Sequence, residues 1–241
     1  MTVKDIYSGL ERIKQQINNQ RTIYNDCLNS RIISEEARHI TMEILEKASN
    51  LLDQLMYLVC ISIKKNNNEN KEKSIRVYFP VSIDEHSLKS TLGRAGLGEI
   101  ENENIDFYRL VLKYQPFENP NYNWLLTFKK IVGKKHITLL PQKRIEEPRI
   151  TVFNSNSDSV SWYPNKVYFK AGVSIMRAPV NPYTQNITPT SGLEVKKEIW
   201  VSFEIDGYNV DAISFCEKVY EQVKTICDDF IETLELKNDA G

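Results

Sequence analysis

The sequence contains few of the residues from which catalytic and metal sites are usually built. Its 241 residues include three histidines, His39, His86 and His136, and none stands at ligand spacing to a cysteine or another histidine. We therefore expect no metal and no cofactor. Four cysteines fall in helical patterns without a Cys-x-x-Cys pair, which predicts buried, reduced thiols in a cytosolic protein. They are Cys27, Cys60, Cys216 and Cys227.

Long apolar runs and a strong net charge are also absent. The longest apolar run, 55–63, is far shorter than the ~20 residues of a membrane helix, and the N-terminus lacks the apolar core of a signal peptide. The net charge of −1 argues against a generally cationic nucleic-acid binder, although a local basic patch is compatible with it. We therefore predict a cytoplasmic protein without membrane contact, and the frequent Asn, Lys and Ile favour a low-GC bacterial source.

Apolar residues recur at helical spacing towards both ends of the chain. The spacing predicts amphipathic helices over 3–29 and 35–63, joined by a link short enough to pair them antiparallel. It also predicts a final helix over 211–234 and a central helix that begins near residue 124. The apolar face of the central helix consists of Trp124, Leu125, Phe128, Ile131 and Val132.

The pattern changes after Pro141, where short segments of β-forming residues alternate with Asn, Ser, Asp, Gly and Pro turns. Leu193 to Ile205 is the clearest strand because its apolar residues occupy alternating positions. The other predicted strands are 149–154, 159–163, 166–169 and 173–178.

Four apolar helix faces each need a partner, and a four-helix bundle satisfies all of them. We therefore predict an α+β fold in which an antiparallel helical bundle, residues 1–146 plus 208–236, carries a β-rich insertion, 147–207, packed on the bundle before the last long helix. An independent C-terminal β domain is the less favoured alternative, because the final helix would then have only the sheet to cover it.

The central helix ends in a basic cluster, which is the candidate functional site. Lysines gather at its C-terminal end, where the helix dipole favours cations, and Gly133 can end the helix in a left-handed conformation. Asn121 and Asn123 are predicted to cap its start. His136 then lies just past the helix and either binds phosphate or caps a turn. The candidate nucleic-acid-binding residues are Lys129, Lys130, Lys134 and Lys135.

Several short motifs occur in a distinctive order. They are Ala37-Arg-His, Leu52-Asp-Gln-Leu, Phe79-Pro-Val, Tyr114-Gln-Pro-Phe, Trp124-Leu-Leu with Lys135-His136 and Leu139-Leu-Pro, and Gly207-Tyr-Asn-Val. This order resembles a group of uncharacterised bacterial proteins that carry an LDHL helix, an FPI segment, a QPY segment and a WLLxELxNxDKHR helix end. Those proteins are similar to HEPN-type helical bundles, a superfamily of metal-independent ribonucleases, toxins and defence proteins with many non-catalytic members.

The resemblance implies where a catalytic site would lie. HEPN nucleases use an arginine and a histidine with four to six residues between them, but no arginine precedes any histidine at that spacing, and Lys130 before His136 is the nearest match. Lysine lacks the bidentate fork of arginine. A non-catalytic binding or scaffold module, homodimeric through its bundle and binding RNA or a protein, is therefore the first hypothesis. A ribonuclease centred on His136, with Lys130 in support, is the alternative.

Other polar and aromatic residues have structural interpretations. Asp53 interrupts an apolar helix face, and we expect it to pair with a lysine of the central helix as a buried contact rather than to act as a catalytic acid. Trp162, Tyr163 and Tyr168 could stack on bases, but aromatic residues of strands usually belong to the core.

Overall fold

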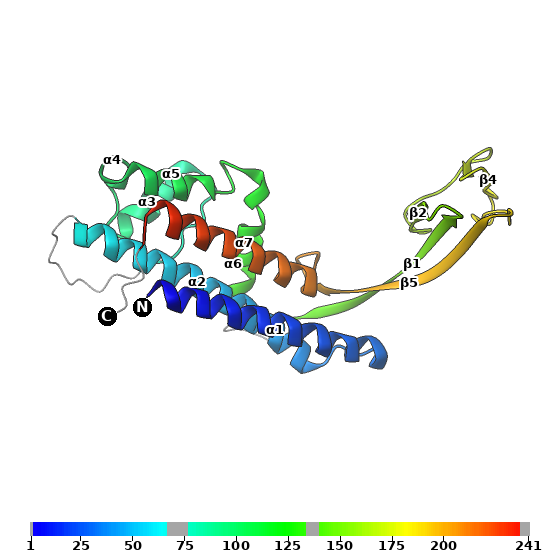
Figure 1. The fold of residues 1–241 in the computed structure, drawn as a ribbon, viewed down its shortest axis with the longest axis horizontal. Coiled ribbons are helices and arrows are strands. Elements are labelled where there is room, and N and C mark those ends of the chain that lie inside the picture. The colour runs from blue at the N-terminus through cyan, green and yellow to red at the C-terminus, as the bar shows by residue number, and fades with distance from the viewer. Residues whose placement is uncertain (1, 67–76, 134–139, 237–241) are drawn as a thin grey trace. The chain divides into compact units, whose positions relative to one another are not determined.

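The computed structural model describes residues 2–66, 77–133 and 140–236. The chain divides into two compact units (Figure 1). The helical unit comprises Met1–Gln142 and Ile205–Gly241, and the β unit comprises Lys143–Glu204. The chain therefore leaves the helical unit once, builds the β unit and returns.

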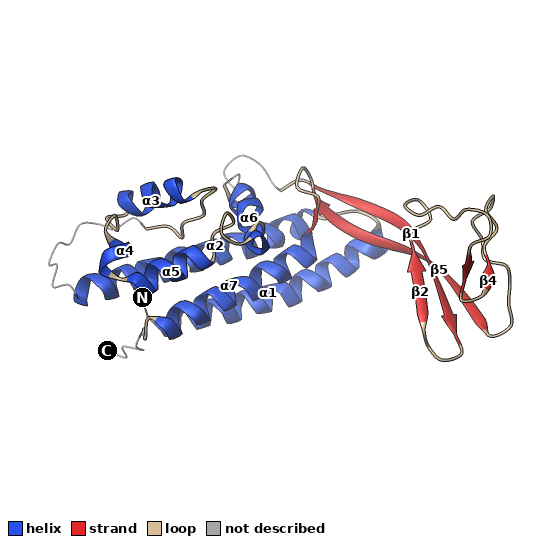
Figure 2. Ribbon diagram, turned by 90° about the horizontal axis from the view of Figure 1, so that it is seen from above, coloured by secondary structure: helices blue, strands red, loops and turns tan. Residues whose placement is uncertain are grey.

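Three long helices form the centre of the helical unit. Helices α1 (Val3–Ser30), α2 (Glu35–Asn66) and α7 (Ala212–Thr233) all pack against one another (Figure 2). Helix α5 (Ile105–Lys113) covers α7 and α6 (Trp124–Val132) covers α2, and the short elements α3, α4 and η1 complete the unit. They span Glu85–Arg94, Ile100–Glu103 and Pro120–Tyr122. The expected four-helix bundle is thus three long helices with α6, of nine residues, too short to be an equal fourth.

Local sequence explains how α1 begins and how closely it approaches α2. The Thr2 side chain accepts a hydrogen bond from the Asp5 amide, and the Asp5 carboxylate accepts one from the Thr2 amide, which forms a capping box. A Cβ at Gly9 would lie 2.4 Å from Leu51 Cδ2. Glycine therefore lets the two helices meet at this level.

A buried polar cluster lies deeper in the helical unit. The Tyr24 hydroxyl lies 2.9 Å from Thr41 Oγ1 and donates to Gln142 Oε1, while Gln20 Nε2 donates to Thr41 Oγ1 at 3.0 Å. Gln20 also donates to Cys216 Sγ of α7. Burial raises the pKa of Tyr24, so the phenol stays protonated. The cluster therefore links all three long helices by hydrogen bonds.

The strands form two antiparallel sheets. Strands β1 (Gln142–Asn154), β2 (Ser159–Trp162), β5 (Leu193–Ile205) and β6 (Val210–Asp211) are ordered β2-β1-β5-β6. β1 and β2 pair with Ile150 opposite Trp162, and the short β3 (Ser174–Ile175) pairs with β4 (Ala178–Pro179). The β unit has its own core of Ile150, Val152, Trp162, Ile175 and Val180.

The strand predictions are partly confirmed. The predicted strand at 193–205 has the bounds of β5, but β1 starts at Gln142 rather than at 149. The strand predicted at 166–169 is wrong, because the amides of Lys166 and Val167 both donate to the Tyr163 carbonyl in a turn. The β unit begins at Lys143 and not at 147, and its packing on the bundle stays a prediction.

Trp124 gives a test of the helical core. Its side chain is 5% exposed and packs beside Phe128. We expect Trp124→Ala to lower the free energy of unfolding by about 3–5 kcal/mol, because it leaves a large cavity. Tyr78→Ala is the control, since Tyr78 is 63% exposed, and it should change stability by less than ~0.5 kcal/mol. Equal losses in the two variants, measured by urea unfolding, would contradict the helix-face assignment.

Candidate functional site around helix α6

Helix α6 is positioned by a short turn and does not start as its sequence suggests. The Asn119 side chain, rather than that of Asn121 or Asn123, accepts the Asn121 amide at 3.0 Å at the start of η1. Asn123 makes no side-chain cap. Gly133 has φ −62°, so the predicted left-handed helix end is wrong, and its amide donates to the Lys129 carbonyl at 2.9 Å.

The structure describes two of the predicted site residues, Lys129 and Lys130. Lys130 is exposed, and its carbonyl accepts a hydrogen bond from the Tyr208 hydroxyl at 3.3 Å. Lys129 is only 28% exposed, and its ammonium lies 3.5 Å from the Asp53 carboxylate and 3.4 Å from Ser49 Oγ. Lys134, Lys135 and His136 lie outside the described residues. Of the described pair, Lys130 is therefore the one open to a ligand.

Asp53 joins three segments of the helical unit. Its carboxylate on α2 accepts the Phe79 amide at 2.9 Å and faces the Lys129 ammonium of α6. The predicted pairing of Asp53 with a lysine of the central helix is thus confirmed, but the contact is half-buried rather than buried, with the two side chains 22% and 28% exposed. A carboxylate held by both an amide and an ammonium fixes the extended segment 77–82 beside the two helices.

Gln115 holds the other end of the same extended segment. Its buried side chain accepts the Ser82 amide at 3.0 Å and donates to the Pro80 carbonyl at 3.0 Å and the Val111 carbonyl at 3.1 Å. A single amide therefore satisfies three backbone groups that burial removes from water. Between these polar contacts, the Phe79 ring meets Phe230 of α7 with centroids 6.1 Å apart.

The short motifs of the sequence therefore meet in space. Asp53 belongs to the Leu52-Asp-Gln-Leu motif, Phe79 to Phe79-Pro-Val, and Gln115 to Tyr114-Gln-Pro-Phe. Tyr208, from Gly207-Tyr-Asn-Val, reaches the end of α6. Each of these polar side chains makes a contact that holds backbone in place. We call this set of contacts, made by Asp53, Gln115, Lys129 and Tyr208, the α6 clamp.

A hollow of about 400 Å³ lies where α6 and α7 begin. Its polar groups are short side chains and one cation, Lys218, while the Asp211 carboxylate on its wall accepts the Ser214 amide at 2.9 Å as the cap of α7. The one carboxylate of the hollow is thus engaged in capping α7. Sequence reasoning missed the hollow because its residues come from two distant segments. They are Asn123, Trp124, Thr127, Val210, Asp211, Ser214, Phe215 and Lys218.

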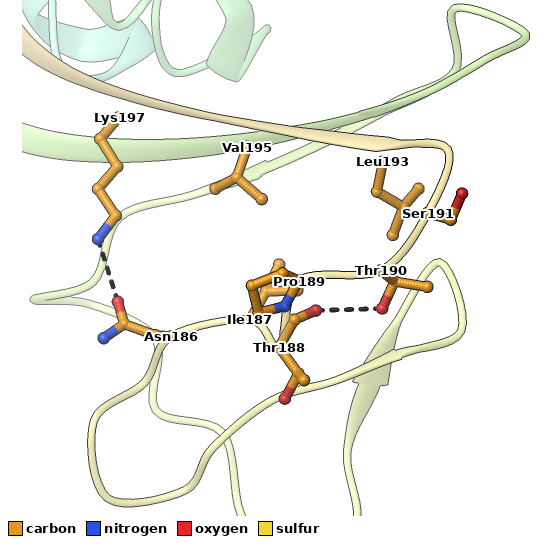
Figure 3. A pocket seen from close by; sticks show the side chains of 9 residues that line it. All are labelled: Asn186, Ile187, Thr188, Pro189, Thr190, Ser191, Leu193, Val195 and Lys197. Atoms are coloured by element: carbon orange, nitrogen blue, oxygen red, sulfur yellow. Dashed lines mark hydrogen bonds between the residues drawn. The ribbon is translucent and has the colours of Figure 1, made fainter.

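A second hollow, of about 810 Å³, lies in the β unit and is formed by strand β5 and the segment 186–191 (Figure 3). Leu193 and Val195 point towards this segment, and Lys197 donates to Asn186 Oδ1 at 3.1 Å. Its walls are aliphatic side chains and hydroxyls, which suit contact with a chain or an apolar ligand more than chemistry on a substrate.

The remaining candidate residues lie apart. His39 and His86 are exposed, and Trp162 is buried in the β core while Tyr168 is exposed. All four cysteines are buried, as predicted, and burial raises the pKa of Cys216 and Cys227 to about 12. These two thiols therefore stay protonated and unreactive at neutral pH. Among the described residues, no three His, Cys, Asp or Glu side chains gather as a metal site, and no helix is long and apolar enough to cross a bilayer.

The α6 clamp predicts a stability difference between neighbouring polar residues. Gln115→Ala should lower the free energy of unfolding by about 2–3 kcal/mol, because the Ser82 amide and the Pro80 carbonyl lose the buried side chain that pairs with them. Lys130→Ala removes only an exposed side chain and should cost less than ~0.5 kcal/mol. Urea unfolding of both variants measures this difference, and an unchanged Gln115→Ala protein would show that the clamp contributes nothing to stability.

Comparison with known proteins gives no family for the chain. No family model matches it, no curated protein matches it, and no solved structure matches it.

Proposed function

We propose that this protein is a non-catalytic binding or scaffold module built on a HEPN-like helical bundle. The observation that supports this proposal is the α6 clamp. The polar residues of the family-like motifs are engaged in holding backbone segments and helices together. A catalytic acid or base must instead reach the proton it transfers on a substrate.

The ribonuclease alternative has less support. Catalysis of RNA cleavage without a metal needs a proton-transfer group and a group that stabilises charge on the phosphate. His136 has no arginine at the family spacing, and Lys130 presents a point charge in its place. Lys129, the neighbouring cation, is already paired with Asp53.

The ligand that the proposal favours is RNA or a protein partner, in a bacterial defence or RNA-related setting. Lys130 is exposed at the end of α6, and the sequence continues with Lys134, Lys135 and His136. Several cations in so short a stretch suit a phosphate backbone. As in HEPN bundles, the module is proposed to act as a homodimer through its helices, on fold analogy.

Incubation of the purified chain with mixed RNA in EDTA tests the absence of catalysis. We expect no cleavage by the wild-type protein, because the clamp residues serve structure. Gel analysis of the RNA over time measures this. Cleavage that disappears in His136→Ala would overturn the proposal in favour of the ribonuclease, whereas cleavage that persists in that variant would indicate a contaminant or another site.

A binding measurement then separates RNA from a protein partner. Binding of the same RNA through the basic cluster should weaken steeply with salt and be lost in Lys130→Ala/Lys134→Ala. Lys14→Ala/Lys47→Ala is the charge-matched control, because both lysines are exposed on α1 and α2. Equal binding by the two double variants would remove the basic cluster as the RNA site, and no binding by the wild type would leave the protein partner.

A further inference from the structure

Strand β5 has an outer edge that the rest of the described chain does not pair. On one side it neighbours β1, and on the other only β6, a strand of two residues. A turn at 206–209 connects β5 directly to β6, so β6 can reach only the end of β5 near Ile205. Along 193–202, the outer N–H and C=O groups of a thirteen-residue strand therefore have no described strand beside them.

The same stretch exposes apolar side chains. Ile199 is 66% exposed, Trp200 49% and Val195 39%. Proteins usually shorten, cover or charge such an edge, because an exposed apolar strand adds a strand from another chain. The combination of free backbone groups and exposed apolar side chains indicates an interaction surface that works by strand addition.

We propose that the occupant of this edge is β5 of a second copy of the chain, paired antiparallel with Lys197 opposite Lys197. A two-fold axis perpendicular to the sheet keeps equivalent faces together, so side chains of one face meet side chains of the same face. This contact lies in the β unit, is separate from the helical dimer contact proposed above, and does not depend on the proposed function.

The sequence of β5 is complementary to itself in this register. Val195 then faces Ile199 of the partner strand, and Leu193 faces Val201, which gives apolar pairs on one face. On the other face Lys196 stands opposite Glu198, twice by symmetry. Opposite charges and aliphatic pairs directly across two strands are the contacts that stabilise a sheet.

Neighbouring registers are less favourable. Moving the axis to residue 196 places Glu194 opposite Glu198, and moving it to 198 places Glu198 opposite itself. Like charges directly opposite each other destabilise a sheet. In the proposed register the like pair is Lys197 with itself, and this ammonium is directed to Asn186 Oδ1 of its own chain at 3.1 Å.

Lys197 lies on the proposed two-fold axis, opposite its own copy, which allows a direct test by cross-linking. In antiparallel strands, directly opposite Cα atoms lie about 4.5–5.5 Å apart, within the range that a disulfide accepts. Lys197→Cys should therefore give a covalent dimer under mild oxidation. Lys196→Cys is the matched control and should stay monomeric on a non-reducing gel, because it faces Glu198. The four native cysteines are buried and should not compete.

Charge reversal tests the register without a covalent bond. Lys196→Glu alone and Glu198→Lys alone each turn two attractive pairs into repulsive ones, and we expect sedimentation equilibrium to show dimer dissociation constants raised about tenfold or more. An equimolar mixture of the two variants should form a heterodimer, because positions 196 and 198 then carry opposite charges in both cross-strand pairs.

Three results would overturn the proposal. They are a wild-type chain that stays monomeric at high micromolar concentration, a dimer that neither charge reversal weakens, and equal cross-linking of Lys196→Cys and Lys197→Cys. Each charge reversal also breaks an ion pair within one chain, because the Lys196 ammonium lies 2.5 Å from the Glu198 carboxylate. Neither variant regains this pair in the mixture, so a heterodimer can only reflect pairs between the two chains.

Discussion

The architecture depends on one backbone constraint, which is that the chain must return to the place where it left the helical unit. The Asp206 amide donates to the Pro141 carbonyl at 2.9 Å, so the segments before β1 and after β5 lie side by side. Next to them, Gln142 accepts the Tyr24 hydroxyl inside the polar cluster of the long helices. This closure is needed because α7, which follows β6, supplies one of the three apolar stripes that pack together. A β unit with its own core can then be inserted without disturbing the helices.

A segment without helix or strand inside the helical unit creates a second requirement, which the α6 clamp meets. Within the part of the chain that the structure describes, the segment 77–82 pairs with no strand, so its buried N–H and C=O groups need side chains. Asp53 supplies an acceptor for Phe79, and Gln115 supplies both an acceptor and a donor for Ser82 and Pro80. The short motifs of the sequence thus have a physical meaning in this chain, independent of any reaction.

The sequence predicts a feature well when the signal for it lies within one continuous stretch of the chain. The long helices and β5 were predicted within a few residues of their ends, because their periodicity runs over many residues. The start of β1 was missed because Lys143 to Arg149 carry charges on both faces of a two-stranded region. The contact of Asp53 with Lys129 could be predicted, since a lone carboxylate on an apolar face needs a cation. The hollow between α6 and α7 could not, because it arises only when distant segments pack.

The charge pattern of β5 connects solubility with recognition. Lysines on an edge strand normally discourage pairing, since two cationic edges repel each other in most registers. In β5 the lysines stand beside Glu194 and Glu198. Whether two β5 edges repel each other therefore depends on the register in which they pair. Moving the two-fold axis by one residue to either side opposes glutamates, whereas the axis at Lys197 opposes Lys196 with Glu198 and Val195 with Ile199. A strand of this kind pairs once, with a partner of the same sequence, and the pairing consumes the edge along which further chains could add.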